Sequence, residues 1–498
     1  MLYTSTRDTS IGLSAAECML KGLSDDGGLF VCQNLEDISF DANSFIGKSY
    51  QYISAAILGA FFTGFSQEEI QNCVDQAYNL SNFDTELIFP TKAIDKGLSV
   101  LELYSGPTLA FKDAALTIFP RLFELAKKKC GENDTTCVLT ATSGDTGAAA
   151  MDGFGKVPST AAVTFYPYQG VSELQLGQML AQTDAKTRAI AVEGNFDDTQ
   201  TAVKKIFSNA GFNREIREIG HFLTSANSIN IGRLVPQIAY YYHSYATLVS
   251  QSRIKEGQKV NFVVPTGNFG DILAGYYAKK TGLPVGKLLC ASNDNKVLTD
   301  FFLTGVYDKN RPFYKTISPS MDILVSSNLE RLIFEALGKD GSATKELMDC
   351  LSATGVFSLS AELGELAGFE AGYASGEDTK TQIKEAWEKY NYLVDPHTAC
   401  GFKVYCDYIA DSGDDAYSVL LATASPFKFA TDVYEAAFGT LGQKTRDSSY
   451  IYALSEAAGL PVPKKIEQTL AIAKKEEIVV KPSEMEDIVK RILIGEIK

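Results

Sequence analysis

The sequence predicts an α/β protein in which helices cover mostly parallel β-sheets. Two observations support this fold class. Four short β-rich runs between residues 98 and 265 each end in a polar loop, and each loop leads into a stretch of helical periodicity. Repeated strand–helix units form parallel sheets, because parallel neighbours need a crossover connection. The first 85 residues read almost entirely as helices, which we expect to pack on this α/β core.

Three helical segments are expected in this opening region, at 14–23, 42–58 and 66–80. The third begins with Ser66, and Glu69 follows three residues later. That spacing is typical of a capping box, in which the serine hydroxyl and the glutamate carboxylate satisfy main-chain N–H groups at the start of a helix. We therefore expect a helix directly after Ser66.

The four strand–helix units come next, with strands expected at 99–104, 135–141, 189–194 and 259–265. Ligands of open parallel sheets bind beyond the carboxyl ends of the strands, so the loops after these strands can converge on one crevice. After residue 295 the pattern is mainly helical, apart from a strand-like run at 418–426. The tail from residue 464 is predicted to be a charged surface helix followed by a strand at 478–482.

Composition and charge exclude several classes of protein. A chain of 498 residues with 45% hydrophobic and 21% charged residues is expected to be globular, with two to four domains. The net charge of −15 argues against a nucleic-acid partner, which would need dense basic stripes. No apolar run approaches the roughly 20 residues of a membrane span. The amino terminus shows no targeting signal, so we expect a cytoplasmic protein.

Cysteine and histidine usage argues against a metal or disulfide protein. The nine cysteines include no C-x-x-C pair, and no two of the three histidines lie three to five residues apart. We therefore expect reduced thiols and no metal site.

Lys112 is the first candidate for chemistry. It follows a Gly-Pro turn and stands at the expected start of a helix, where a cation is disfavoured. One interpretation is a neutral amine that condenses with an aldehyde cofactor, because burial and the helix dipole both lower the pKa of an amine there. The alternative is a solvated lysine whose stem covers apolar surface. Spacing alone favours the alternative.

The loop at 266–271, of sequence TGNFGD, is the second candidate. Its glycines allow the main chain to approach a ligand closely, and the N–H groups of the following helix can bind a phosphate. The loop lacks the strings that bind nucleoside triphosphates and dinucleotides, so a compact monophosphate suits it better. An ordinary strand–helix turn is an equally good interpretation of this loop taken alone.

Further polar groups follow or flank the other expected strands. The loop with Ser143, Asp145 and Thr146 suits a carboxylate, and a plain helix cap is the alternative interpretation. Arg233 and the run containing Thr423 and Lys428 could line a crevice, and so could 395–401 with its single histidine. We expect that histidine, His397, to be a hydrogen-bonded structural residue rather than a general base.

Six separated strings together resemble the threonine synthase family, in its longer fungal and bacterial branch. In chain order they are SGPTLAFKD, TSGDTGAAA, NSINIGRLVPQ, PTGNFGD, DPHTACG and ATASPFKF. The opening strings YTSTRDTS and GLSDDGGLFV are similar to the amino-terminal signature of that family. The resemblance covers the chain from near residue 1 to about residue 435.

The resemblance implies a fold-type II pyridoxal-phosphate enzyme with two open, twisted, mostly parallel sheets flanked by helices. It implies a helical region at 1–85, a large cofactor-binding domain at 86–114 and 216–498, and a small mobile domain at 115–215. The implied reaction converts O-phospho-L-homoserine and water to L-threonine and phosphate, the last step of threonine biosynthesis. A monomer and a homodimer are both compatible with the sequence.

The resemblance also assigns residue roles. The implied ligands of pyridoxal 5′-phosphate are Lys112, Gly267, Asn268, Phe269, Gly270, Asp271 and Thr423. Of these, Lys112 would hold the cofactor covalently and act as catalytic base and acid, the loop would bind the cofactor phosphate, and Thr423 would hydrogen-bond the pyridine nitrogen. The implied substrate ligands are Ser143, Asp145, Thr146, Arg233 and Lys428. The first three would contact the carboxylate and the two cations the leaving phosphate.

Two alternatives stay open at this point. Another enzyme of the same fold type, such as a serine/threonine dehydratase or a β-replacement synthase, would share the lysine and the glycine loop. A catalytically idle relative would instead bind a phosphorylated ligand as a sensor or interaction protein.

Overall fold

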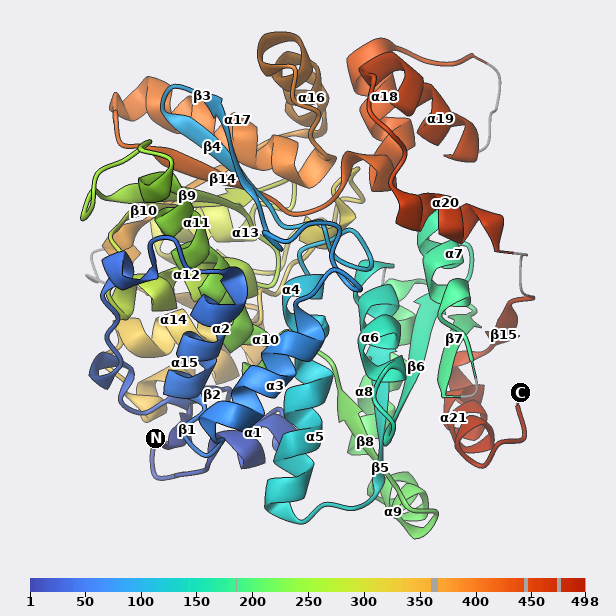
Figure 1. Cartoon of the computed structure of the whole chain (residues 1–498). Coiled ribbons are helices and arrows are strands. Elements are labelled where there is room, and N and C mark those ends of the chain that lie inside the picture. The colour runs from blue at the N-terminus through green and yellow to red at the C-terminus, as the bar shows by residue number, and fades with distance from the viewer. Residues whose placement is uncertain (143, 185, 360–365, 443–446, 473–475, 498) are drawn as a thin grey trace.

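Two parallel sheets, each covered by helices, organise the chain (Figure 1). The computed structural model describes residues 1–142, 144–184, 186–359, 366–442, 447–472 and 476–497. The six-stranded sheet has the order β13-β10-β9-β14-β4-β3, and the five-stranded sheet has the order β15-β7-β6-β5-β8. All neighbouring strands in these two sheets run parallel except β3 and β4. The expected α/β architecture with two mostly parallel sheets is confirmed.

The strands of the larger sheet are β3 (Thr91–Asp95), β4 (Leu98–Glu102), β9 (Val260–Pro265), β10 (Val285–Ser292), β13 (Phe369–Tyr373) and β14 (Ser418–Ala422). Those of the smaller sheet are β5 (Thr135–Ala141), β6 (Thr160–Pro167), β7 (Thr187–Val192), β8 (His221–Ser225) and β15 (Ile478–Val480). Every residue of β9 is buried, which explains its nearly continuous apolar sequence, because helices cover both faces of a parallel sheet. The four predicted strands are all present, two in each sheet.

The helical opening region is also confirmed. It contains α1 (Ala15–Lys21), α2 (Tyr50–Phe61) and α3 (Gln67–Ala77), together with the short ribbon of β1 (Tyr3–Ser5) and β2 (Phe30–Cys32). The predicted capping box at the start of α3 is present, with Ser66 and Glu69 each accepting the main-chain N–H of the other. Residues 42–45 form a separate 3₁₀ turn before α2 rather than its first turn.

The opening region braces the elements around the predicted site. The Tyr78 hydroxyl donates to the Ala114 carbonyl at 2.6 Å, and Asn230 donates from its side chain to the Met19 carbonyl at 2.8 Å. The fully buried Arg331 donates to the Phe30 carbonyl at 2.9 Å. Helices, strands and loops that follow in the sequence are thus tied to the first 85 residues at three points.

Helices cover both sheets and connect their strands. Those that connect the strands up to β8 are α4 (Asp113–Leu116), α5 (Phe119–Cys130), α6 (Asp145–Gly155), α7 (Glu173–Ala181), α8 (Phe196–Ser208) and α9 (Ala210–Glu218). Those that follow up to β14 are α10 (Ile231–Leu234), α11 (Ile238–Ser250), α12 (Gly270–Lys280), α13 (Val297–Thr304), α14 (Leu329–Ala336), α15 (Gly341–Thr354), α16 (Gly376–Tyr390) and α17 (Pro396–Ser412). Among the helices of the described ranges, none combines the length and apolar character that crossing a bilayer requires.

The tail from residue 464 begins with a helix, as predicted, and then contributes a strand to the smaller sheet. It contains α20 (Lys464–Ala471) and α21 (Met485–Leu493), and it follows α18 (Ala430–Phe438) and α19 (Asp447–Ala458). The predicted strand in the tail is present as β15, which pairs with β7, and α21 buries its apolar face next to them (Figure 1). The smaller sheet therefore extends beyond the expected range of 115–215, because β8 and β15 also belong to it.

We predict that Met485→Ala destabilises the smaller sheet region by about 2–5 kcal/mol, because it leaves a cavity where a fully buried side chain now packs. Urea unfolding followed by circular dichroism would measure the change. Ile494→Ala, at a residue that is 47% exposed and nine positions further on, is the matched control and should change stability by less than about 0.5 kcal/mol. Equal effects of the two substitutions would contradict a structural role for the tail.

Candidate active site

Lys112 is the N-cap residue of α4, at the helix start where the sequence places it. The loop before it is held by the buried Asp113 carboxylate, which accepts hydrogen bonds from the main-chain N–H and the hydroxyl of Thr108 at 2.8 and 2.7 Å. The Lys465 amine of α20 also donates to the Ser105 and Gly106 carbonyls of this loop. The main chain that carries Lys112 is therefore fixed on both sides.

The Lys112 amine is enclosed among polar groups. Its Nζ lies 3.0 Å from Ser320 Oγ and 3.4 Å from Asp145 Oδ2, and its side chain is 12% exposed. Burial lowers the pKa of Lys112, and the positive charges of Lys428 and Arg233 lower it further, against the opposing effect of Asp145. The environment thus shifts the amine toward its neutral form, which is the form that acid–base and covalent chemistry require.

Asp145 is the carboxylate shared by the two lysines. Its Oδ1 lies 2.8 Å from Lys428 Nζ and accepts a second hydrogen bond from Gln175 Nε2 at 3.1 Å. Burial alone would raise the pKa of Asp145, but the charges of Lys428 and Lys112 hold it well below its usual value. Lys428 also donates to the Thr108 carbonyl at 2.7 Å, and its side chain is fully buried. Both charges are therefore engaged within the protein.

The glycine loop at 267–271 presents main-chain donors at the start of α12. In the described part of the chain, the N–H groups of residues 267–270 have no protein acceptor, whereas the N–H of Asp271 faces its own carboxylate. Phe269 adopts a left-handed conformation with φ of 64°, held by packing of its ring against Phe302 and Phe369. Strained conformations of this kind persist where the surroundings enforce them, commonly at binding sites. A row of free donors at a helix start suits a phosphate.

Gly267 brings this loop close to the Lys112 site. A Cβ atom at this position would lie 2.5 Å from the Ser320 carbonyl oxygen, so only glycine allows the contact. Ser320 in turn contacts the Lys112 amine. The short turn that contains Ser320 therefore contacts both the glycine loop at 267–271 and the Lys112 amine.

The side chain and the carbonyl of Asp271 are both hydrogen-bonded within the protein. Its Oδ1 accepts the N–H of Ile272 at 2.9 Å, and its carbonyl accepts the hydroxyl of Tyr241 at 2.7 Å. Burial raises the pKa of Asp271 to about 7. A carboxylate would repel a phosphate, so the Asp271 side chain is not expected to contact an anion bound by this loop.

Thr423 presents a hydroxyl next to the Lys112 loop. Its carbonyl accepts the N–H of Phe111 at 2.8 Å, and its own N–H donates to Thr398 Oγ1 at 3.3 Å. Within the described residues its side-chain hydroxyl has no hydrogen-bond partner, although Thr423 is only 4% exposed. A buried hydroxyl of this kind can serve an external acceptor or donor such as a pyridine nitrogen.

Arg233 is a buried cation on α10. Its Nη1 donates to the Ala226 carbonyl at 2.7 Å, whereas its buried Nε has no partner. No acidic side chain in the described ranges pairs with it, and burial lowers its pKa to about 10. The guanidinium stays charged at neutral pH and can bind an anion through a fork of donors.

The loop after β5 ends in donors at the start of α6. The Thr142 hydroxyl accepts the N–H groups of Gly144 and Gly147, at 2.9 and 3.1 Å. In the described structure the N–H groups of Asp145 and Thr146 have no protein acceptor, and Thr146 is half-buried. Ser143 lies outside the described residues. The loop can therefore bind a carboxylate through its main chain.

Sequence reasoning missed Ser320 and assigned His397 only a structural role. His397 is hydrogen-bonded at both ring nitrogens, to Asp395 Oδ1 at 2.7 Å and from the Ser320 N–H at 3.1 Å. This agrees with the prediction of a hydrogen-bonded residue. Ser320 does not follow a predicted strand, and neither of its sequence neighbours is charged. No sequence pattern therefore indicated a role for it.

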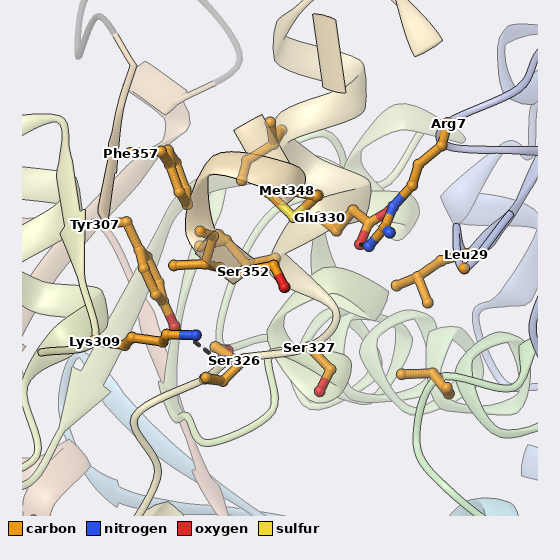
Figure 2. Close-up of a pocket in the computed structure, with 16 residues that line it drawn as sticks. Arg7, Leu29, Tyr307, Lys309, Ser326, Ser327, Glu330, Met348, Ser352 and Phe357 are labelled. Atoms are coloured by element: carbon orange, nitrogen blue, oxygen red, sulfur yellow. Dashed lines mark hydrogen bonds and ion pairs between the residues drawn. The ribbon is translucent and has the colours of Figure 1, made fainter. Parts of the chain in front are cut away.

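A separate cavity of about 330 Å³ is lined by Ser326, Tyr307 and Phe357 among other residues (Figure 2). Its wall includes Ser326, whose hydroxyl donates to the Gly267 carbonyl at 2.7 Å, while Arg7 forms an ion pair with Glu330 at its edge. Neither Lys112 nor residues 268–271 line this cavity.

Among the described residues, this site contains neither a reactive cysteine nor a cluster of metal ligands. In the ranges that the structure describes, no three His, Cys, Asp or Glu side chains lie close enough to hold a metal ion. The cysteines are unpaired, and burial raises the pKa of Cys137 and of Cys400 to about 12. Neutral buried thiols are poor nucleophiles.

Comparison with known proteins points to one family. Residues 2–78 match the family model described as threonine synthase N terminus. The chain is 37% identical to a threonine synthase of Pseudomonas aeruginosa, over 88% of this chain and 91% of that protein. It is also 37% identical to a threonine synthase of Schizosaccharomyces pombe, over 86% and 87% of the two chains. The crystal structure of PLP-bound threonine synthase from Brucella melitensis aligns with a TM-score of 0.85 at 34% identity, covering 99% of both chains.

We predict that Asp271→Asn stabilises the cofactor-free protein increasingly as the pH rises. The folded pKa of about 7 exceeds the ordinary value of 3.8, so the folded state loses stability between these values and carries the full cost of a buried charge above them. Asparagine removes that cost. The difference in unfolding free energy between variant and wild type should grow by about 2 kcal/mol from about pH 5 to about pH 8, measured by urea unfolding. A difference independent of pH would contradict the raised pKa.

Proposed function

This chain belongs to the threonine synthase family, and from that premise we propose that it converts O-phospho-L-homoserine and water to L-threonine and inorganic phosphate. Its cofactor is pyridoxal 5′-phosphate and its fold is that of the type II enzymes that use this cofactor, as the resemblance implied. The observation that carries the reaction is the pairing of a buried amine with lowered pKa and a loop of unsatisfied N–H groups, joined by Ser320.

The residues fit the cofactor. Lys112 would hold it covalently, the N–H groups of 267–270 would bind its phosphate, and the Thr423 hydroxyl would face its ring nitrogen. When bound, the cofactor supplies an electron sink that stabilises negative charge at the substrate carbons. A neutral hydroxyl at the ring nitrogen, in place of a carboxylate, moderates that withdrawal.

The remaining roles follow from charge and donors. The N–H groups of Asp145 and Thr146 would bind the substrate carboxylate, while the Asp145 side chain stays paired with Lys428. Because Lys428 is engaged in that pair, we assign the leaving phosphate to Arg233, whose Nε has no protein partner. Of the two cations that the sequence suggested, only Arg233 is available without breaking a buried ion pair.

The Lys112 amine would move the protons. As a neutral base it would take the proton from the substrate α carbon, release it within the site, and then take one from the β carbon, so that phosphate departs from the γ carbon. One proton would return to the γ carbon and one to the α carbon, while water would add its hydroxyl at the β carbon and give its remaining proton to the departing phosphate. Closure of the smaller sheet region, which carries Asp145 and Thr146, would exclude bulk water during these steps.

We also propose a cytoplasmic enzyme that works as a monomer or a homodimer, with no nucleic-acid or membrane partner. Its unpaired cysteines support a reducing compartment.

The test is a product assay with O-phospho-L-homoserine. Wild-type protein supplied with the cofactor should release threonine and phosphate in equal amounts and show a visible absorbance band that borohydride bleaches. Lys112→Ala should lose both the band and the activity, whereas Lys96→Ala, at an exposed lysine, should keep both. Formation of a 2-oxo acid from serine or threonine, without threonine from phosphohomoserine, would identify a dehydratase instead.

We predict that Arg233→Gln raises the KM for phosphohomoserine at least about 30-fold, because a charge-assisted pair of hydrogen bonds to the substrate phosphate is lost. The cofactor content should not change, since the cofactor phosphate is bound by the glycine loop. Steady-state kinetics and cofactor absorbance would measure both quantities. Arg253→Gln, at an exposed arginine, is the control. An unchanged KM with a lower cofactor content would place Arg233 at the cofactor instead.

A further inference from the structure

Ser320 completes a triangle with Lys112 and Asp145. It lies in the 3₁₀ turn η4 (Pro319–Met321), and its hydroxyl is 3.0 Å from Lys112 Nζ and 3.4 Å from Asp145 Oδ2. The amine and the carboxylate are themselves 3.4 Å apart. At these distances the hydroxyl accepts from the amine and donates to the carboxylate.

The main chain of Ser320 is fixed on two sides. Its N–H donates to His397 Nε2 at 3.1 Å, and the other nitrogen of this ring, Nδ1, lies 2.7 Å from the fully buried Asp395 carboxylate. Because Nε2 accepts, the ring proton is on Nδ1 and faces Asp395. On the other side, the Ser320 carbonyl packs on Gly267, where there is no room for a Cβ atom. The turn cannot shift without disturbing the histidine or the glycine loop.

A serine, a histidine and an aspartate in contact suggest a nucleophilic triad, but the contacts of Ser320 and His397 exclude such a triad. His397 accepts the main-chain N–H of Ser320 and makes no hydrogen bond with its hydroxyl in the described structure. A histidine that activates a serine must hydrogen-bond the hydroxyl itself. Asp395 also caps α17, accepting the N–H of His397 at 2.9 Å. Asp395 and His397 therefore hold the main chain of Ser320 in place, and the Ser320 hydroxyl is directed at Lys112.

We propose that Ser320 is a positioning residue for the Lys112 amine and that Asp395 and His397 hold it in place. The proposal rests on the proposed function, in which this amine must be neutral and must serve several carbons of the substrate in turn. A neutral amine has one lone pair and can rotate about its last bond. A hydrogen bond to Ser320 fixes that rotation and directs the lone pair at the substrate.

The hydroxyl also contacts both the amine and the carboxylate. The Asp145 carboxylate, 3.4 Å from the amine, favours the charged amine, which cannot act as a base. Ser320 offers an uncharged acceptor to the amine and an additional donor to Asp145. It can therefore orient Lys112 without favouring its protonation.

The test compares Ser320→Ala with Ser320→Thr in the cofactor-loaded enzyme. The alanine variant should lose about 10- to 100-fold in kcat, as expected when a reacting group is misplaced, with KM and the visible absorbance band within about twofold of wild type. The threonine variant keeps the hydroxyl and should regain most of the lost kcat. Ser352→Ala, at an exposed hydroxyl on α15, is the control.

A double-variant experiment tests whether His397 acts on kcat through Ser320. His397→Leu should lower kcat in the same way, and the double variant Ser320→Ala/His397→Leu should be no worse than the weaker single variant within about twofold, because both changes act through one contact. Multiplicative losses would show that His397 acts independently and would overturn its role in holding Ser320.

The outcomes separate the two proposals. A wild type that makes no threonine would refute the proposed function. An active wild type with an equally active Ser320→Ala variant would refute the positioning role and leave the function standing. Loss of the cofactor band instead of kcat in Ser320→Ala, or no recovery in Ser320→Thr, would indicate a merely structural serine and would also overturn the proposal.

Discussion

The buried Asp145 carboxylate lies beside two buried lysines at the centre of this protein, and a third basic side chain, Arg233, acts on Lys112 through its charge. Asp145 pairs with Lys428 and lies close to Lys112, while Arg233 has no acidic partner in the described ranges. This local excess of positive charge exists in a chain whose net charge is −15. Salt screens buried charges weakly, so the imbalance acts strongly on whatever enters. It would attract an anion, and the charges of Lys428 and Arg233 also disfavour protonation of the Lys112 amine. One arrangement thus serves binding and acid–base chemistry together.

The rest of the structure keeps that arrangement rigid on one side. The opening helices hold α4, the loop before α10 and the start of α14 through Tyr78, Asn230 and Arg331. The glycine loop at 267–271 is held by hydrogen bonds from Ser326 to the Gly267 carbonyl and from Tyr241 to the Asp271 carbonyl. The donors of Asp145 and Thr146, by contrast, belong to the smaller sheet region. The cofactor side is therefore preorganised, and the side that would contact the substrate carboxylate is the one with fewer ties to the opening region.

Much of this was predictable because it is encoded locally. The strands before Lys112 and before the glycine loop are short apolar runs, and the capping box of α3 is a spacing of two residue types. The division into two sheets was not a local property, and it came only from the resemblance. The pairing of Lys428 with Asp145 joins residues far apart in sequence, so the sequence suggested a free cation where the structure has an ion pair. Ser320 was missed for the same reason, since its role depends on contacts with three distant segments.

The late position of β15 in the sequence has a consequence for synthesis on the ribosome. Its partner β7 ends at Val192, whereas β15 begins at Ile478, after all strands of the larger sheet have been made. Until then the β7 edge stays open, and an open edge can pair with another nascent chain. Premature termination after β14 would therefore yield a product with a nearly complete larger sheet and an unpaired strand edge that can bind other chains. Such a fragment is a natural substrate for chaperones and for quality-control proteases.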